Sequence, residues 1–498
     1  MGLKRWIAER WAHSRAKAIR RVHENAVASQ HRTLKQLIYK ATNTQFGQDH
    51  GFAGIASPAD FRARVPVRNY EAGRKYFDAI RDGQSDVTWP GKPLYLAKTS
   101  GTTSGAKYIP ITRDSIRYQI KGARDALLLY IHETGNSAFL DGRMMFLSGS
   151  PVLDTNDHGL KVGRLSGIVN HFVPSYLRRN QVPTYATNCI EEWEQKVDKI
   201  LDETLPEDLR LISGIPPWVQ MYFERLEERT GEKPLERWPN LSLFAQGGVD
   251  FSPYEGVFRN YFDERIDILE LFPASEGFFA LQDKMPSQGL LLNLAYGMYY
   301  EFIPMAEYGN EHPTRLGLED VELDTQYALI VSSNAGLWAY DIGDTVKFVS
   351  KNPHRLKVTG RVKHFISAFG EHVIVEEVNR AMIHACEQHG AEIVEFTVAP
   401  QLAGGEGDSF HEWLVEFRQS PPDEAAFSTT LDAELRRQNS YYDDLRNGNM
   451  LRAAVVRKIQ LNATREYMRA IGKLGGQNKF PRLSNNRKIA DWLQDYVL

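Results

Sequence analysis

The sequence predicts an α/β fold, with a large N-terminal α/β domain over residues 1–361 and a smaller α+β domain over residues 362–498. Three observations lead to this prediction. Short apolar runs alternate with helical patterns between residues 93 and 361. The pattern changes after residue 361, and the length of 498 residues suits several domains of roughly 100–200 residues each. The hydrophobic fraction of 42% and the charged fraction of 25% exclude wholesale disorder.

We expect mostly parallel sheets in the large domain. Apolar runs of roughly four to eight residues between turn residues are typical of buried strands. Helical patterns separate most of these runs, so crossover connections and parallel pairing are expected. The predicted strands cover residues 93–97, 144–147, 209–213, 243–245, 267–272, 327–332 and 345–349.

The smaller domain is predicted from a different order of elements. Loops are marked by Gly404-Gly405-Glu406-Gly407 and by Pro421-Pro422. The order βαββαβ is that of a ferredoxin-like domain. Its elements are expected as a strand at 364–367, a helix at 375–389, strands at 393–400 and 412–419, a helix at 423–446 and a strand at 453–459.

Both ends of the chain are basic, although the formal net charge is only −3. Residues 1–40 hold ten Lys or Arg against two Glu, and residues 451–498 hold ten against three acids. We expect no nucleic acid partner, and the N-terminal helix either makes peripheral membrane contact or packs on the protein. We favour packing, because the apolar pattern continues beyond this helix into Leu34, Leu37 and Ile38. The helix itself carries Trp6, Ile7, Trp11, Ile19 and Val22 at near-helical spacing.

Cysteine content and hydropathy narrow the class of protein further. Cys189 and Cys386 are too few for a disulfide framework, and both are expected to be core residues rather than nucleophiles. No apolar run approaches the roughly 20 residues of a membrane-spanning helix, so no transmembrane segment is expected. We therefore expect a cytoplasmic protein.

The most informative segment is Lys98-Thr99-Ser100-Gly101-Thr102-Thr103-Ser104-Gly105-Ala106-Lys107. Glycines let consecutive backbone N–H groups turn toward an anion, hydroxyls add donors, and Lys107 adds positive charge. The spacing differs from the Walker phosphate loop, in which Lys follows the second glycine directly. A flexible surface loop is the alternative. Polyphosphate binding is favoured, because apolar strands flank the segment.

This segment resembles the phosphate loop of acyl-adenylate-forming ligases, and most closely that of the GH3 auxin-responsive family of acyl acid–amido synthetases and their bacterial relatives. Further motifs follow in that family's order and cover nearly the whole chain. Position 341 departs from the family, which has arginine there, so no role is carried over to Asp341. The motifs are Ala274-Ser275-Glu276-Gly277, Tyr300-Glu301-Phe302-Ile303-Pro304, Tyr340-Asp341-Ile342-Gly343-Asp344, Gly360-Arg361 with Gly370-Glu371, a helix with Leu431-Asp432, Leu435, Asn439, Tyr442 and Arg446, and Gln477-Asn478-Lys479-Phe480-Pro481-Arg482.

The resemblance implies an ATP-dependent ligase with Mg²⁺ as a cofactor. Its partners would be a small carboxylic acid, activated as acyl-adenylate with release of pyrophosphate, and an amine or amino acid that receives the acyl group as an amide. Two alternatives stay open: an acyl-CoA ligase that forms a thioester, and a non-catalytic nucleotide-binding regulatory protein. The acid itself is not predicted; segment 168–176 and Trp338 line its pocket or belong to the core.

By the same resemblance, most candidate residues surround the nucleotide. Phe272 is otherwise a core residue, and Asp344 is otherwise the acid of a β-turn. The assignments are Thr99, Ser100, Gly101, Thr102, Thr103 and Lys107 for the phosphates, Gly247, Gly248 and Phe272 for adenine, Asp344 for ribose, and Ala274, Ser275 and Arg361 for the remaining nucleotide contacts.

Two candidates act on the reacting groups. Glu276 follows a predicted strand, and the carboxyl ends of strands are where open α/β sheets bind ligands. We assign it to Mg²⁺ and to catalysis; capping a following helix is the alternative. Lys479 is the predicted catalytic lysine, with Lys488 second, and its ammonium would offset negative charge at the carboxylate and α-phosphate. A hinge at residues 361–363 would let the small domain close and then rearrange.

Overall fold

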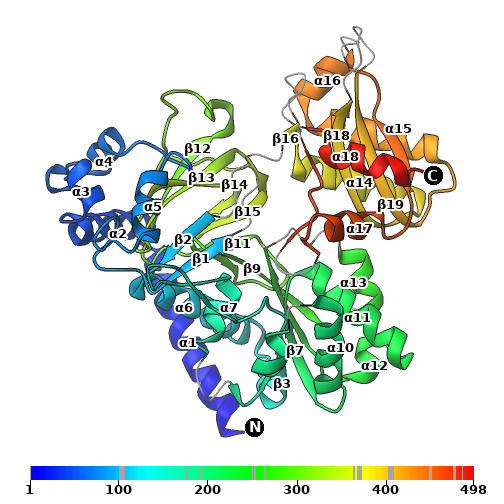
Figure 1. Ribbon diagram of the computed structural model, residues 1–498, viewed down its shortest axis with the longest axis horizontal. Helices are drawn as coiled ribbons and strands as arrows, with labels where there is room; N and C mark the ends of the chain where they lie inside the picture. The colour runs from blue at the N-terminus through cyan, green and yellow to red at the C-terminus, as the bar shows by residue number, and fades with distance from the viewer. Residues whose placement is uncertain are drawn as a thin grey trace. The chain divides into compact units, whose positions relative to one another are not determined.

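The computed structural model describes residues 2–99, 107–173, 178–190, 192–248, 251, 254–262, 265–362, 365–366, 373–401, 409–447, 451–474, 478–484 and 486–498. The chain divides into two compact units (Figure 1). The first contains Met1–Ile342 and Val346–Val358, and the second contains Gly343–Thr345 and Thr359–Leu498. Within the described residues, every helix is too short or too polar to span a bilayer.

The first unit is built on two sheets. The larger one joins, among the described residues, eleven strands in the order β12-β13-β14-β15-β11-β10-β9-β8-β7-β3-β6, and the smaller one has the order β2-β1-β5-β4. The strands are β1 (Tyr95–Thr99), β2 (Lys107–Ile111), β3 (Arg143–Phe146), β4 (Asp154–Thr155), β5 (Lys161–Gly163), β6 (Gln181–Val182), β7 (Leu209–Ser213), β8 (Leu243–Gly247), β9 (Asp267–Ala274), β10 (Gly277–Gln282), β11 (Leu290–Leu292), β12 (Met298–Pro304), β13 (Gln326–Ser333), β14 (Leu337–Lys351) and β15 (His354–Arg361).

The larger sheet is parallel in one half and antiparallel in the other. β6, β3, β7, β8 and β9 are parallel neighbours, because helices connect β6, β7, β8 and β9 in sequence. β9–β10, β10–β11, β11–β15 and β12–β13 pair antiparallel. The sheet is therefore less parallel than expected, since turns and loops rather than α-helices join consecutive strands after residue 274.

Helices cover both faces of the parallel half (Figure 1). On one face α10, α11 and α13 pack in a cluster that includes Val197, Phe223 and Phe244. On the other, α1 and α6 pack over Leu243 and neighbouring strand residues. The helices are α1 (Leu3–His23), α2 (Ala26–Ala41), α3 (Gln45–Asp49), α4 (Pro58–Arg64), α5 (Arg74–Arg81), α6 (Arg113–Thr134), α7 (Leu165–Asn170), α9 (Tyr185–Asn188), α10 (Trp193–Thr204), α11 (Pro216–Thr230), α12 (Pro234–Arg237) and α13 (Glu255–Phe262).

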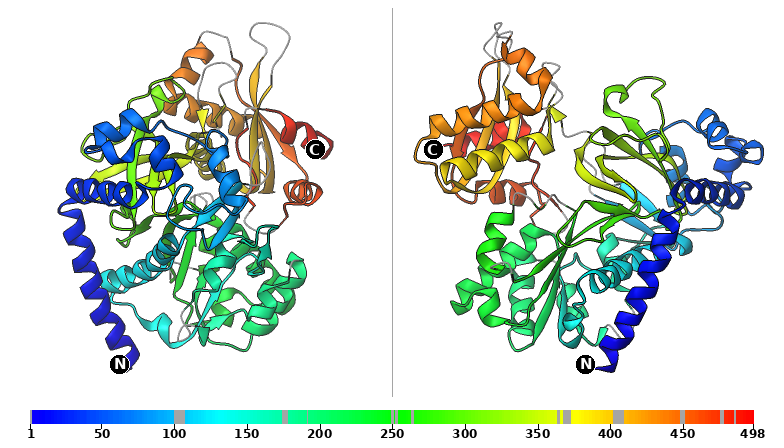
Figure 2. Two further views of the ribbon diagram at one scale, coloured as in Figure 1. Left: turned by 60° about the vertical axis from the view of Figure 1, so that its left-hand side comes forward. Right: turned by 180° about the vertical axis from the view of Figure 1, so that it is seen from behind.

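The basic N-terminal helix α1 packs on α6, as favoured above, through part of the expected set: Ile19 packs against the cluster between the two helices, and Arg124 of α6 lies over the ring of Trp11. Figure 2 shows the two helices side by side. Ala12 is fully buried between them, and Arg15 donates to the buried Asp125 at 2.6 Å. Trp6 and Ile7 are about half exposed, at 50% and 51%. The contact is therefore made by small and medium-sized side chains around Ala12, and Trp6 and Ile7 at the start of the helix lie outside it.

The second unit has a central sheet in the order β18-β19-β20. β18 and β19 pair antiparallel, and β19 and β20 pair parallel. α14 and α15 cover one face of this sheet, and α17 and α18 cover the other (Figure 2). The elements are β16 (Phe365–Ile366), β17 (Val373–Ile374), α14 (Val375–His389), β18 (Glu392–Gln401), β19 (Phe410–Gln419), α15 (Glu424–Gln438), α16 (Ser440–Asn447), β20 (Val455–Ile459), α17 (Ala463–Ala470) and α18 (Lys488–Leu493).

The βαββαβ order is observed with two differences. The first predicted strand, at 364–367, pairs with β17 in a separate two-stranded sheet, so three strands form the central sheet in the described part of this unit. The second predicted helix is divided at Asn439, whose side chain accepts from the N–H of Tyr442 and so begins a new turn.

Candidate active site

The predicted phosphate loop connects two paired strands. β1 and β2 are antiparallel, and Thr99 and Lys107 form the last pair of their register. Residues 100–106 connect this pair and lie outside the described residues, among them Ser100, Gly101, Thr102 and Thr103. The Nζ atom of Lys107 lies 5.9 Å from the ring centroid of Tyr70. The strand pair therefore fixes both ends of the loop, and Lys107 stands at one of them.

Gly247 ends strand β8 and Gly248 follows it, and each position favours glycine for its own reason. A Cβ atom on Gly247 would lie 2.4 Å from the carbonyl oxygen of Leu271, its partner on β9. Gly248 has a φ of +87°, in the left-handed region. Gly247 is therefore required for the close packing of β8 on β9, and contact of these glycines with adenine stays a prediction.

Glu276 lies in the turn between β9 and β10. Ala274 and Gly277 pair across this turn, so Ser275 and Glu276 form a two-residue hairpin connection. The alternative role as a helix cap is wrong, because a strand follows. Since β8 and β9 are parallel, Glu276 and Gly247 lie at the same edge of the sheet.

The surroundings of Glu276 suit a magnesium ion that is held mostly by phosphate. Mg²⁺ keeps several waters and commonly takes only one or two protein carboxylates plus phosphate oxygens. The described residues contain no group of three or more His, Cys, Asp or Glu arranged around a common metal position. A single half-buried carboxylate at the sheet edge therefore fits this metal, and its binding stays a prediction.

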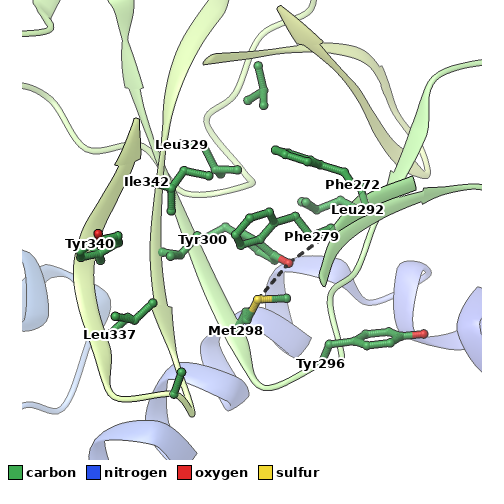
Figure 3. Packing of buried hydrophobic residues seen from close by; sticks show 14 of the residues in the cluster. Phe272, Phe279, Leu292, Tyr296, Met298, Tyr300, Leu329, Leu337, Tyr340 and Ile342 are labelled. Atoms are coloured by element: carbon green, nitrogen blue, oxygen red, sulfur yellow. Dashed lines mark hydrogen bonds between the residues drawn. The ribbon is translucent and has the colours of Figure 1, made fainter. Parts of the chain in front are cut away.

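Phe272 lies in the hydrophobic core of the antiparallel half. It is 6% exposed, and its ring centroid is 5.1 Å from that of Phe279 in an edge-on arrangement. Figure 3 shows the two rings with Leu292 in the same cluster. Phe272 is thus a core residue, which was the alternative to adenine contact. Contact with adenine stays a prediction. Trp338 is likewise a core residue, 3% exposed, and its indole N–H donates to the carbonyl of Thr88 at 2.9 Å.

Asp344 and Arg361 lie in the long strands β14 and β15. Gly343, with a φ of +82°, accepts from the backbone N–H of Val362 at 2.9 Å. Asp344 is 7% exposed and belongs to strand β14, so the alternative of a β-turn acid is wrong. Arg361 is the last residue of β15. Ribose binding by Asp344 and the nucleotide contact of Arg361 stay predictions.

The predicted catalytic lysine lies in the second unit, next to a segment anchored on β18. Lys479 is exposed. Three residues later, Arg482 donates from Nε to Oε1 of Glu395 at 2.6 Å, and its carbonyl accepts from the N–H of Val398 at 2.9 Å. Lys488, the second candidate, is exposed at the first residue of α18. The contacts of Arg482 with Glu395 and Val398 therefore attach this segment to β18, and Lys479 lies at the surface of the unit.

Sequence reasoning missed a group of buried polar side chains in the first unit. Ser148, Ser166 and Asn188 each have buried polar atoms without a hydrogen-bond partner. Lys196, 2% exposed, lies against them. One signal was available: Lys196 stands four residues before the buried Ile200, on the apolar stripe of its helix. Ser148 also follows a predicted strand, where ligand-binding residues are common.

Gln246 was missed in the same way. It immediately precedes Gly247 on β8, is 1% exposed, and neither Oε1 nor Nε2 has a hydrogen-bond partner. Native proteins seldom leave a buried amide unsatisfied. Its amide is a buried polar group next in sequence to the glycine pair.

Solved structures identify the class of protein to which this fold belongs. GH3.15 acyl acid amido synthetase matches with a TM-score of 0.78 at 18% identity, over 95% of this chain and 94% of that chain. A 2-hydroxyisobutyryl-CoA ligase in its postadenylation state matches with a TM-score of 0.61 at 12% identity, over 95% and 92%. The chain has the fold of the acyl-adenylate-forming ligases, as predicted.

Sequence comparison then gives the family. Models of the GH3 family N-terminal, central and C-terminal domains match residues 15–172, 291–361 and 376–488. The chain belongs to the GH3 family. Among curated relatives, indole-3-acetic acid-amido synthetase GH3.15 of Arabidopsis thaliana is 22% identical over 95% of this chain and 93% of its own length. Jasmonoyl–L-amino acid synthetase JAR4 of Nicotiana attenuata is 21% identical over 64% and 66%. The predicted family and class of enzyme are confirmed.

Proposed function

We propose that this chain converts a small carboxylic acid into an amide in two ATP-dependent steps. In the first, a carboxylate oxygen attacks the α-phosphorus of ATP, an O–P bond forms, and the bond to pyrophosphate breaks. In the second, an amine nitrogen attacks the acyl carbon, AMP leaves, and the nitrogen loses a proton. The match of all three GH3 domains in chain order is the observation that carries this proposal.

The first step brings two anions together, so the site must supply positive charge and hydrogen-bond donors where negative charge grows. The loop between β1 and β2 supplies both, through its hydroxyls, backbone N–H groups and Lys107. We assign the triphosphate to Thr99, Ser100, Gly101, Thr102, Thr103 and Lys107.

The nucleoside lies along the carboxyl ends of β8 and β9 in this proposal. The position of Gly247 at the carboxyl end of β8, at the same sheet edge as Glu276, supports its assignment to adenine. Glu276 would hold Mg²⁺, which supplies charge to the phosphate oxygens when bound. The remaining assignments are Gly248 and Phe272 for the base, Asp344 for ribose, and Ala274, Ser275 and Arg361 for further nucleotide contacts.

Lys479 is assigned to the reacting carboxylate and the α-phosphate. Residues 1–361 are then the adenylation domain, and residues 362–498 are a mobile domain that brings the lysine in. A hinge at 361–363 would serve closure and the later rearrangement for acyl transfer. The exposure of Lys479 beside an anchored arginine supports this role.

Acid-dependent exchange of pyrophosphate into ATP tests the first step. We expect exchange with at least one acid from a panel of aromatic, aliphatic and dicarboxylic acids. Amino acids, hydroxylamine and a thiol, offered in parallel with mass detection of products, test the second step, and an amide is expected. ATP binding without exchange for any acid would favour the nucleotide-binding regulator, and a thioester as the sole product would favour an acyl-CoA ligase.

A further inference from the structure

The ammonium of Lys196 is buried without a carboxylate partner. Its Nζ donates to the carbonyl oxygens of Ser148 at 2.9 Å and Asn188 at 2.8 Å. Both of these hydrogen-bond partners in the described part of the chain are backbone carbonyls. A buried charge that only neutral carbonyls contact is costly, and burial lowers the pKa of Lys196 to about 8. An anion beside this lysine would remove the cost.

The two residues whose carbonyls hold the ammonium, and Ser166 nearby in the fold, carry buried polar atoms without a partner. Asn188 is 1% exposed, and both its Oδ1 and its Nδ2 lack a hydrogen-bond partner. The hydroxyls of Ser148 and Ser166 are also buried and unpartnered. A Cβ placed on Gly149, the residue after Ser148, would lie 3.1 Å from Cδ of Arg164 and 3.5 Å from Oγ of Ser166, so Ser166 and Arg164 lie beside this segment. Neighbouring residues thus carry a cation, an amide N–H₂ and two hydroxyls.

The cluster lies at the edge of the sheet where the proposed reaction takes place. Ser148 follows β3, whose carboxyl end points the same way as those of β7, β8 and β9. Three strand spacings, about 14 Å, separate β3 from β9, which leads to Glu276. Ser166 comes three residues after Gly163, which pairs with Ala97 of β1 just before the phosphate loop. The cluster and Glu276 thus follow strands of one sheet at the same edge, three strands apart.

We propose that Lys196, Asn188, Ser148 and Ser166 form a subsite for a substrate carboxylate that does not react. The carboxylate accepts from the ammonium, from Nδ2 of Asn188 and from the serine hydroxyls. This inference rests on the proposed function, which offers two sources of such a group. One is the carboxylate of an amino-acid acceptor, and the other is the second carboxylate of a dicarboxylic acyl substrate.

Asn188→Leu is the decisive variant. The side chain of Asn188 makes no hydrogen bond within the protein, so a similar-sized apolar residue should leave folding intact. Lys196→Met removes the charge, and Lys199→Met is the matched control, because Lys199 lies on the same helix with its side chain 58% exposed. We expect the first two variants to weaken carboxylate binding roughly tenfold to hundredfold, and the control to match the wild-type protein.

Binding is measured first without ATP, as the shift in unfolding temperature. The probes are glutarate against glutaramate, and L-alanine against L-alaninamide. A shift with one of the carboxylates that Asn188→Leu abolishes supports the subsite, even if no acid gives pyrophosphate exchange. Equal shifts in the wild-type protein and Asn188→Leu, or no shift with any probe, would overturn it, as would a crystal structure with water alone in the cluster.

Kinetics then separate the two sources. If the acceptor is bound here, Asn188→Leu raises the KM for the amino acid in amide formation and leaves pyrophosphate exchange unchanged. If a dicarboxylic acid is bound here, the same variant raises the KM for that acid in exchange and leaves the KM of ATP unchanged. Equal losses with carboxylate and carboxamide substrates would contradict both.

Discussion

Nε of Arg482 lies 2.6 Å from Oε1 of Glu395, and this ion pair joins the segment of Lys479 to strand β18. Both side chains are mostly buried, at 10% and 13% exposure, and the guanidinium also lies over the ring of Phe396 at 5.2 Å. A pair in this setting resists salt screening, because water has little access to it. The position of the proposed catalytic lysine thus depends on a residue that never needs to touch the substrate.

Arg482→Met should therefore reduce both stability and adenylation. It leaves the carboxylate of Glu395 without this partner, at a cost of about 3 kcal/mol in the free energy of unfolding. Urea unfolding and pyrophosphate exchange check the two effects. The control is Arg469→Met, which removes an exposed pair with Glu466 in α17 and should cost less than about 1 kcal/mol. Wild-type exchange in Arg482→Met would contradict the positioning role.

Lys479→Ala should slow adenylation roughly a hundredfold to a thousandfold, the usual loss when one group that stabilises transition-state charge is removed. The KM of ATP should change little, since the triphosphate is assigned to the first unit. Amide formation from a supplied acyl-adenylate should persist. Lys488→Ala, at an exposed position in the same unit, should retain exchange, and a loss in Lys488→Ala alone would move the assignment to that lysine.

Gly247→Ala should weaken ATP binding and destabilise the sheet. The added methyl would lie 2.4 Å from the backbone oxygen of Leu271, so β8 and β9 must separate. We expect a cost of about 1–3 kcal/mol in unfolding free energy, typical of overpacking, and a higher KM for ATP. Gly256→Ala is the control: its Cβ meets nothing within 4 Å in helix α13, where alanine should stabilise. Equal behaviour of the two variants would contradict the steric argument.

His23 should make the first unit sensitive to acid. It is 8% exposed, and burial, with His354 and Arg355 nearby, lowers its pKa to about 4. The same side chain titrates near 6.5 in the unfolded chain. Between these values the unfolded state binds a proton that the folded state does not, so stability falls as the pH drops through this window. The whole window is worth about 3 kcal/mol.

His23→Gln should remove that part of the pH dependence, as measured by urea unfolding at pH 7 and pH 4.5. His158→Gln, at a side chain that is 49% exposed, is the matched control and should keep the wild-type slope. Identical slopes in all three proteins would show that His23 is protonated in the folded state.

Strands were predicted well where a local run of apolar residues determines them. The strand runs at 144–147, 209–213 and 327–332 coincide with β3, β7 and β13, because buried strands need unbroken apolar sequence. Parallel pairing after residue 274 was overestimated, since pairing direction depends on turns that carry little apolar signal. Gly247 was selected by resemblance to the family. The structure explains the glycine by a contact with Leu271 on the neighbouring strand β9, and a local sequence pattern cannot reveal such a contact.

The motif Tyr300-Glu301-Phe302-Ile303-Pro304 shows how a family motif can be structural. Glu301 is 1% exposed on β12 and forms a buried ion pair with Arg315. Burial raises the pKa of Glu301, which the guanidinium of Arg315 opposes. The resemblance identified this motif, but the sequence does not show whether its residues serve packing or catalysis. Asn188 and Lys196, in contrast, were not selected from the sequence. Their burial follows from contacts between segments distant in sequence.

One strand contributes to both units. Gly343, Asp344 and Thr345 sit in the middle of β14, yet they cluster with the C-terminal residues, and Oγ1 of Thr359 donates to Oγ1 of Thr345 at 2.9 Å. Chimeras that exchange C-terminal parts between relatives at a single crossover near residue 361 would therefore split this tripeptide from its neighbours. Grafts that carry residues 343–345 along with the donor's C-terminal part should express and fold better.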